Sequence, residues 1–531
     1  MATRYDVVVV GGGHNGLVNA AYLARAGKKV LVLERRHVLG GAAVTEEIFP
    51  GFKFSVCSYV VSLLRPEIIR DLDLPRHGLE ILPLDGTFTP ATDGGNYLWR
   101  VNDHAKTMRE IRRHSRQDAE AYEEFGKAML QMCRFVKPIL GMTPPDPTSL
   151  NPRDLRKLFF LGRRFQALSS GDRYNQVQLM TMSAIDFLDQ WFETDILKAT
   201  MSASGIIGTF LGVRSPGTAY VLLHHYMGEI DGAFRAWGFA RGGTGAISNA
   251  IASAAREAGV EIRTKAPIAK ILIKGGRATG VVLENGETIA SVVVSSSVDP
   301  NRTFLRMIDP EHLQPDFVEE VRRYKFRGSS GKVNLALDAL PEFTCLPGAG
   351  AHLRGAISIS PSVEYMERAY DDAKYGAFSR QPYIDMVIPS LTDPSVAPPG
   401  KHILSCFVQY APFKLKEGPE AWEQKRETFG DTVVDTIARY APNLKKIIVG
   451  RQVLTPLDLD REFGLTEGNI FQGELSLEQL FFLRPVPGWA KYRTPIKNLY
   501  MCGSATHPGG GIMGAPGRLA AVEILKDQGT A

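Results

Sequence analysis

The sequence contains few cysteines, and their spacing excludes several kinds of site. Five cysteines occur among the 531 residues, and no two of them form a C-x-x-C pair. A dithiol redox centre, a cysteine-bound zinc ion and a disulfide framework all need paired or clustered cysteines. We therefore expect none of these features, and we expect the protein to work in a reducing compartment.

Basic runs and long apolar runs are also absent. Lys and Arg exceed Asp and Glu by only 62 to 57, so nucleic acid is not an expected partner. No uninterrupted apolar segment reaches the roughly 18 residues that a transmembrane helix needs. The first apolar strand starts a few residues after Met1, which leaves no room for a signal or transit peptide. We therefore expect a cytoplasmic protein.

The N-terminal segment has the pattern of a dinucleotide-binding fold. The stretch "DVVVVGGGHNG" is a β-branched strand followed by Gly11, Gly13 and Gly16 in the spacing G-x-G-x-x-G. In such a loop the first glycine permits a tight turn and the second lets the backbone approach a diphosphate. The third lets the helix pack on the strand. The helix expected over 15–26 would direct its positive end at the diphosphate.

An acidic residue and a second glycine pair extend this pattern. Glu34 ends the next predicted strand, "KKVLVLE", where its carboxylate can accept hydrogen bonds from both ribose hydroxyls of an adenosine. The same carboxylate would repel a 2′-phosphate, so FAD or NAD is favoured over NADP. Gly40 and Gly41 follow at a turn that many flavoproteins place near the diphosphate, which favours FAD.

A second glycine-rich segment lies near the C-terminus. "NLYMCGSATHPGGGIMGAPGRLAAVEIL" predicts a strand, a turn at 503–504, a bend at 509–511 and a helix over 515–525. The glycine bend would let the backbone approach a flat ring. The start of the helix would favour the negative charge of a reduced flavin. Between the two ends, helices are expected from about 100 to 231.

Several segments are similar to one flavoprotein family. Residues 7–43 and 498–521 resemble the two ends of phytoene desaturase-like (carotenoid oxidoreductase) flavoproteins. The interior segments "LLHHYMGEIDGAFRAWGFARGGTGAIS" and "GNIFQGELSLEQLFFLRP" resemble most closely one subgroup, named for pyridine nucleotide-disulfide oxidoreductases. The resemblance covers essentially the whole chain. Because the chain has no C-x-x-C pair, we reject disulfide chemistry.

The resemblance implies an α/β fold with a glutathione-reductase-like FAD-binding Rossmann domain, an inserted α+β substrate domain and a helical cap. The FAD-binding domain would be assembled from residues 1–95, 236–305 and 488–531. Residues 96–235 would form the helical cap or a membrane-facing lobe, and residues 306–487 the substrate domain.

The resemblance also implies FAD as the cofactor and a set of contacts to it. Ser504 stands where many flavoproteins of this fold have an aspartate, so it contributes no charge at the ribityl chain. The implied contacts are Gly11, Gly13, Gly16, Glu34, Gly40 and Gly41 for the AMP and diphosphate, Ile268 for the adenine, Gly503 and Ser504 for the ribityl chain, and Gly511 and Ile512 for the isoalloxazine.

No residue is identified as catalytic. His225, from the pair in "LLHHYMGE", and His507, ahead of the glycine bend, are candidates for a base or a positioning residue. A structural role is the alternative for both. The eleven histidines show no metal-ligand spacing such as H-E-x-x-H, so we predict no metal site.

The expected reaction is hydride transfer from a hydrophobic substrate, polyene or lipid-derived, to flavin N5. No second dinucleotide motif is present, so oxygen or a quinone is favoured as electron acceptor. The direction of reaction and the oligomeric state stay open. Two alternatives remain, a regulatory or interaction protein with structural FAD and an FAD amine oxidase. An amine oxidase would need an aromatic cage, for which the sequence gives no clear pair.

One basic amphipathic segment bears on membrane contact. "PRDLRKLFFLGRRFQAL" mixes five Lys and Arg side chains with Leu and Phe. Such a helix can lie in a membrane interface, or it can pack its apolar face on the protein core with its charges solvated. We favour the second interpretation and keep peripheral membrane contact as the alternative.

Overall fold

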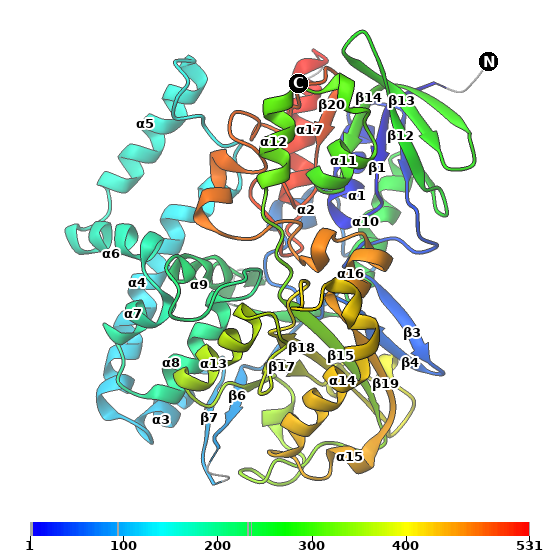
Figure 1. Cartoon of the computed structure of the whole chain (residues 1–531). Helices are drawn as coiled ribbons and strands as arrows, with labels where there is room; N and C mark the ends of the chain where they lie inside the picture. The colour runs from blue at the N-terminus through cyan, green and yellow to red at the C-terminus, as the bar shows by residue number, and fades with distance from the viewer. Residues whose placement is uncertain (1–3, 93–94, 231–232, 235, 530–531) are drawn as a thin grey trace.

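The computed structural model describes residues 4–92, 95–230, 233–234 and 236–529. Two seven-stranded sheets organise these residues and lie at different ends of the molecule in Figure 1. Within the described part of the chain, no helix has both the length and the apolar character needed to cross a bilayer.

The first sheet contains the predicted dinucleotide-binding strands. Its order is β11-β2-β1-β14-β13-β12, and β20 pairs with β14. β1 runs parallel to β2 and to β14, with Val8 opposite Leu31 and Val294. These strands are buried on both faces, which explains their continuous β-branched runs. The strands are β1 (Tyr5–Val10), β2 (Val30–Leu33), β11 (Glu261–Arg263), β12 (Ile268–Lys274), β13 (Arg277–Leu283), β14 (Thr288–Ser296) and β20 (Leu499–Met501).

Three helices from distant parts of the chain pack beside this sheet. They are α1 (His14–Arg25), α10 (Gly245–Glu257) and α17 (Ala515–Asp527). Helices α1 and α17, blue and red in Figure 1, approach closely enough for Asn19 Nδ2 to donate to the carbonyl of Gly517 at 3.0 Å. A Cβ at Gly517 would overlap the carbonyl oxygen of Asn15. Three chain segments thus build one Rossmann-type unit, and the predicted fold class is confirmed.

The second sheet is mixed, with the order β19-β15-β18-β17-β16-β6-β7. Only β16 and β6 pair in parallel. The strands are β6 (Thr87–Pro90), β7 (Tyr97–Arg100), β15 (Ser330–Leu337), β16 (Ala356–Ile359), β17 (Tyr383–Val387), β18 (His402–Gln409) and β19 (Ile448–Leu454). Strand pairing therefore brings β6 and β7 into this sheet, although the predicted division ends an FAD-binding segment at residue 95. The five-part division itself stays a prediction.

A helical lobe lies between β7 and the middle of the chain. Its core includes Phe125, whose ring contacts several other aromatic rings. Helix α5 stands away from the body of the molecule in Figure 1. The helices of this lobe are α3 (His104–Arg112), α4 (Arg116–Leu140), α5 (Pro152–Gln166), α6 (Ser170–Thr181), α7 (Ala184–Asp189), α8 (Asp195–Ser202) and α9 (Thr218–Tyr226).

The remaining elements are short connections and outer helices. The helices are α2 (Pro66–Asp71), α11 (Pro300–Arg306), α12 (Pro315–Arg323), α13 (Val363–Lys374), α14 (Trp422–Ala438), α15 (Leu444–Ile447) and α16 (Pro456–Phe463). The strands are β3 (Thr45–Phe49), β4 (Phe52–Ser55), β5 (Ile81–Pro83), β8 (Glu229–Ile230), β9 (Ala233–Phe234) and β10 (Gly238–Ala240).

Candidate cofactor and substrate site

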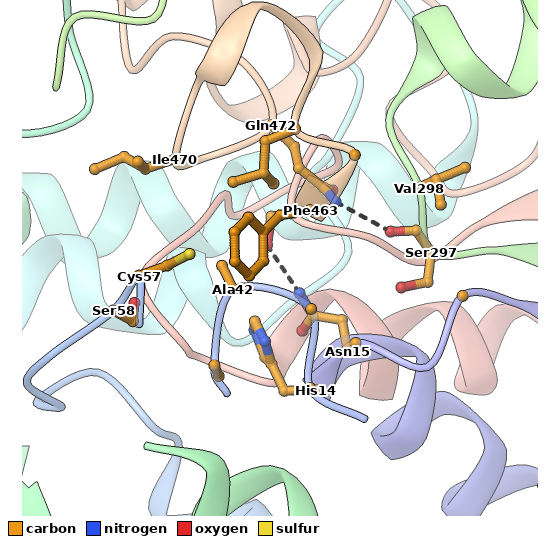
Figure 2. A pocket seen from close by; sticks show the side chains of 18 of the residues that line it. His14, Asn15, Ala42, Cys57, Ser58, Ser297, Val298, Phe463, Ile470 and Gln472 are labelled. Carbon is orange, nitrogen blue, oxygen red and sulfur yellow. Dashed lines mark hydrogen bonds between the residues drawn. The ribbon is translucent and has the colours of Figure 1, made fainter. Parts of the chain in front are cut away.

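A cavity of about 480 Å³ connects the two sheets. One end lies at the carboxyl ends of β1, β2 and β14, where open α/β sheets bind their ligands. The other end lies against residues of the second sheet. Figure 2 shows His14 and Asn15, from the start of α1, on one side of it and Ile470 and Gln472 on the other.

Glycine backbone forms the wall at the start of α1. Gly11, with φ of +93°, Gly13, Gly40 and Gly41 all line the cavity. A Cβ added at Gly13 would have only Ser297 Oγ within 4 Å, at 3.8 Å, so the space beside this glycine is open. The loop thus leaves room for a ligand against its backbone.

Two predicted glycines serve packing. A Cβ at Gly16 would overlap the carbonyl oxygen of Gly11, and one at Gly503 would overlap the carbonyl oxygen of Ser297. Neither glycine lines the cavity. Both are needed where a helix or turn passes close to a strand end.

Glu34, which follows β2, and Ile268, which starts β12, line one end of the cavity; the spacing predicts Glu34 as a site residue, and the family resemblance implies Ile268. The side chain of Glu34 is held by two backbone donors, because Oε2 accepts from Gly12 N and Oε1 from Arg36 N, each at 2.8 Å. A carboxylate has about four lone-pair positions, so each oxygen keeps acceptor capacity for a hydroxyl group. Arg302 lines the same end and pairs with Asp460 at 2.8 Å.

His14 and Asn15 line the cavity but were not predicted as site residues. Asn15 Nδ2 donates to Ser504 Oγ at 3.0 Å, which links the two glycine-rich segments. Asn15 Oδ1 and His14 Nε2 find no hydrogen-bond partner among the described residues. Removal from solvent lowers the pKa of His14 to about 4, so it is neutral at pH 7. Their place between the last two glycines of the motif could have identified them.

Strained backbone forms the wall at the C-terminal bend. Ile512 has φ of +54° and Gln472 has φ of +55°, a region that side-chain-bearing residues rarely adopt. Both residues line the cavity, together with Ser504 and Gly511. Such strain is concentrated at binding sites, where the surrounding structure holds it.

The far end of the cavity is mostly apolar and aromatic. Tyr59 and Phe407 form a stacked pair with ring centroids 6.0 Å apart and planes 23° apart. His225 and Trp237 form a second pair, with centroids 6.2 Å apart and planes 14° apart. The sequence had suggested neither pair; Tyr59 and Phe407 come from segments far apart in the chain, whereas His225 and Trp237 lie 12 residues apart. The other side chains at this end are Cys57, Ser58, Val60, Ser62, Leu63, Ile207, Ile470 and Phe471.

A buried cation lies behind this aromatic wall. Lys332 Nζ lies 4.2 Å from the ring centroid of Tyr59 and donates to Ser405 Oγ at 2.7 Å. Burial lowers the pKa of Lys332 to about 8. The hydroxyl of Tyr59 donates to Asp385, whose pKa is raised to about 6 by loss of solvent. Neither Lys332 nor Asp385 lines the cavity itself.

The two candidate histidines have different positions. His225 lines the cavity, and its Nδ1 donates to the carbonyl of Val221 at 3.0 Å. His507 does not line the cavity, and its Nε2 donates to the carbonyl of Ile139 at 2.9 Å. Burial lowers the pKa of each to about 4, so both are neutral at pH 7. The structure therefore brings only His225 to the site.

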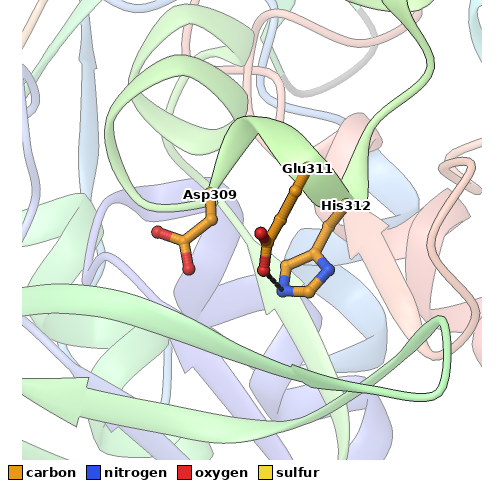
Figure 3. A group of neighbouring side chains, drawn as sticks. All are labelled: Asp309, Glu311 and His312. Atoms are coloured by element: carbon orange, nitrogen blue, oxygen red, sulfur yellow. Dashed lines mark ion pairs between the residues drawn. The ribbon is translucent and has the colours of Figure 1, made fainter.

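Three side chains on the surface could in principle hold a metal ion. The ligand atoms of Asp309, Glu311 and His312 lie within 4.8 Å of one another (Figure 3). Glu311 pairs with His312 at 3.8 Å, and Asp309 pairs with Lys270. Ion pairs of this kind are common on protein surfaces. The group lies outside the cavity.

The fold places the cavity at the carboxyl ends of parallel strands, the position at which dinucleotide-binding folds hold their ligands. Residues 16–525 match the family described as flavin containing amine oxidoreductase, and the chain belongs to that family. The predictions of an FAD-dependent oxidoreductase and of FAD as its cofactor are thus confirmed. The open glycine backbone and the unpaired atoms of His14 and Asn15 fit a ligand that carries phosphate and hydroxyl groups.

Relatives cover nearly the whole chain. It is 43% identical to pyridine nucleotide-disulfide oxidoreductase domain-containing protein 2 of Rattus norvegicus, covering 99% of this chain and 94% of the relative. It is 27% identical to a limonene dehydrogenase polypeptide of Castellaniella defragrans, with 99% and 95% covered. It is 25% identical to a lycopene-forming phytoene desaturase of Pseudescherichia vulneris, with 96% of each covered. The predicted family resemblance is confirmed.

A solved structure shows the same fold. An oxidoreductase from Methanosarcina mazei superposes with a TM-score of 0.61 at 17% identity, covering 99% of this chain and 100% of that chain.

Proposed function

We propose that the protein is an FAD-dependent dehydrogenase of an uncharged hydrophobic substrate. The supporting observation is the chemistry of the cavity end at Tyr59. Its lining side chains are apolar, aromatic or neutral, and no carboxylate is among them. A polyene or another lipid-derived hydrocarbon chain fits such a surface, because its apolar groups leave water without leaving a charge unpaired.

The chain's own residues bind and orient the two ligands. The predicted contacts that line the cavity stay our assignment for FAD: Gly11, Gly13, Glu34, Gly40, Gly41, Ile268, Ser504, Gly511 and Ile512. When bound there, FAD supplies the acceptor for a hydride. The aromatic pairs at the far end would hold the substrate C–H bond in place and exclude water. Of the two candidate histidines, His225 lines the cavity and His507 does not, so we assign substrate contact to His225.

Oxidation of an amine is the second candidate, because Tyr59 and Phe407 form the stacked pair that the sequence had not suggested. Two features oppose it. No carboxylate lines this end of the cavity, and the ammonium group of Lys332 already lies against the ring of Tyr59. A second cation there would be repelled. The names of two relatives, a limonene dehydrogenase and a phytoene desaturase, also support a hydrocarbon substrate.

Oxygen or a quinone is the proposed electron acceptor, because the sequence contains a single strand–glycine–helix motif of the dinucleotide type. A separate nicotinamide domain would need a second motif.

Peripheral membrane contact through α5 is part of the proposal. The sequence favours an α5 whose apolar face is buried on the protein core. This interpretation is wrong for Phe159 and Phe160, whose side chains are 67% and 44% exposed. The helix is fixed to the body by the ion pair of Asp154 with Lys491 at 2.6 Å. Exposed aromatic side chains beside several arginines suit the surface of an anionic membrane, where a hydrophobic substrate would be found.

The test is anaerobic mixing of the purified FAD-loaded protein with a terpene hydrocarbon, with a polyene and with a primary amine of matched carbon skeleton. We expect the visible flavin bands to bleach with a hydrocarbon and to return in air or with a quinone. Bleaching by the amine alone would favour the amine oxidase. Bands that do not bleach even with dithionite would favour a regulatory protein with structural FAD. A protein that binds no FAD would contradict the proposal.

A further inference from the structure

Arg484 is fully buried, with 0% of its surface exposed. Its guanidinium donates six hydrogen bonds to five backbone carbonyl oxygens. The acceptors are Ser504 (2.9 and 3.2 Å), Phe471 (3.0 Å), Gly473 (3.1 Å), Glu474 (3.2 Å) and Gln479 (3.3 Å). The donors are therefore all used, but every acceptor is a neutral carbonyl.

The charge of Arg484 has no counter-ion among the described residues. The carboxylate of Glu474 binds Arg327 Nε at 2.6 Å and accepts from Phe210 N at 2.6 Å. The ring centroid of Tyr324 lies 5.7 Å from the guanidinium carbon.

The two histidines and the tyrosine nearest Arg484 are neutral at pH 7. Burial lowers the pKa of His224 to about 3 and that of His507 to about 4, and the nearby guanidinium adds to both shifts. Burial also raises the pKa of Tyr324 to about 12. A buried cation without an anion is costly, so compensation from outside the chain is expected.

The charge lies directly behind the cavity wall. Its acceptors Phe471 and Ser504 line the cavity, and so do Gln472 and Ile512 beside them. We propose that Arg484 is a positioning residue whose positive charge stabilises the negative charge that bound FAD acquires on reduction. This inference rests on the proposed function, because it requires the isoalloxazine to lie at this wall.

The charge balance of the reaction gives the reason. Dehydrogenation would remove a hydride and a proton from the substrate: the hydride would bring two electrons and one proton to the cofactor, and the other proton would leave to water. The ring therefore gains one negative charge unless a second proton follows. In a poorly solvated interior a fixed cation would stabilise this charge far more than water-exposed groups would. Neutral donors could hold the same carbonyls, so the permanent charge of arginine is the distinguishing property.

The test compares Arg484→Gln, which loses the charge, with Arg484→Lys, which keeps it. The control is the double variant Arg327→Gln with Glu474→Gln, which removes an ion pair whose two charges cancel. The readouts are the two-electron reduction potential of the FAD-loaded protein and its affinity for sulfite, an anion that adds to oxidised flavin and leaves the ring negative. We expect Arg484→Gln to lower the equilibrium constant for reduction at least tenfold, which is about 30 mV. Sulfite binding should weaken similarly, and Arg484→Lys and the control should stay within about threefold of the wild type.

An FAD-loaded Arg484→Gln protein with the wild-type potential would show that Arg484 only holds the loops. A wild type that binds no FAD would instead contradict the proposed function. If neither Arg484 variant folds, the inference is tested on the wild type by measuring the pH at which its reduced FAD takes up a proton. Its reduced FAD should keep the negative charge to lower pH than free reduced FAD, and protonation at the same pH would overturn the inference.

Discussion

Asn15 and Ser504 lie 489 positions apart in the sequence and are joined by a hydrogen bond of 3.0 Å inside the cavity wall. Asn15 follows the first glycine loop, and Ser504 precedes the second glycine bend. The two ends of the chain thus form one ligand site. The amide of Asn15 takes a hydroxyl partner here, where many flavoproteins of this fold would present a carboxylate.

Gly13→Val should lower the affinity for FAD at least tenfold. Gly13 has φ of −68°, so valine fits the backbone, and the loss would come from a side chain entering the open space beside the loop. The measurement is flavin absorbance per protein after loading with excess FAD. Gly126→Val in α4 is the matched control, because a Cβ there has no atom within 4 Å. Full flavin content in Gly13→Val would place the cofactor elsewhere.

Ser504→Ala should destabilise the protein by roughly 1 to 3 kcal/mol, because it leaves the buried amide of Asn15 without its acceptor. Denaturant unfolding of the cofactor-free protein measures this effect. Thr432→Ala, which removes a hydroxyl bonded within an exposed helical turn, should cost much less. Equal losses for the two variants would mean that the Asn15–Ser504 contact contributes little.

The folded protein should lose stability as the pH falls from about 6.5 to about 4. His225 and His507 are buried and neutral, with pKa values lowered to about 4, so the unfolded chain binds more protons in this range. Each contributes about 3 kcal/mol over the whole interval. His507→Gln keeps a donor for Ile139 and should flatten the dependence of unfolding free energy on pH by about one proton.

Phe159→Ser combined with Phe160→Ser should reduce co-sedimentation with anionic vesicles several-fold, because both rings are exposed on the basic helix α5. Replacing two exposed apolar side chains elsewhere, Tyr375→Ser with Val449→Ser, should have no such effect. Neutral vesicles should bind the wild type less than anionic ones. Unchanged sedimentation of the α5 variant would remove the membrane proposal.

Sequence spacing predicted that Gly13 and Glu34 lie at one site, and both line the cavity, but it missed His14 and Asn15 in the same loop. Gly13 and Glu34 belong to one strand–loop–helix–strand unit, so their separation along the chain determines their separation in space. The far end of the cavity could not be predicted in this way. Lys332 and Phe407 lie opposite each other because β15 pairs with β18, and Tyr59 packs against both from the segment that follows β4. His507 illustrates the same limit, since only the packed loop shows that it turns away from the cavity.

The distribution of the cofactor site over both ends of the chain has a consequence for biosynthesis. While the polypeptide is still on the ribosome, the nucleotide loop and Asn15 emerge first, and their partner Ser504 emerges last. A site that includes this contact is complete only after residue 504 has been synthesised. Until α17 has been synthesised, the apolar face of α1 that it covers stays exposed, and molecular chaperones can bind that surface.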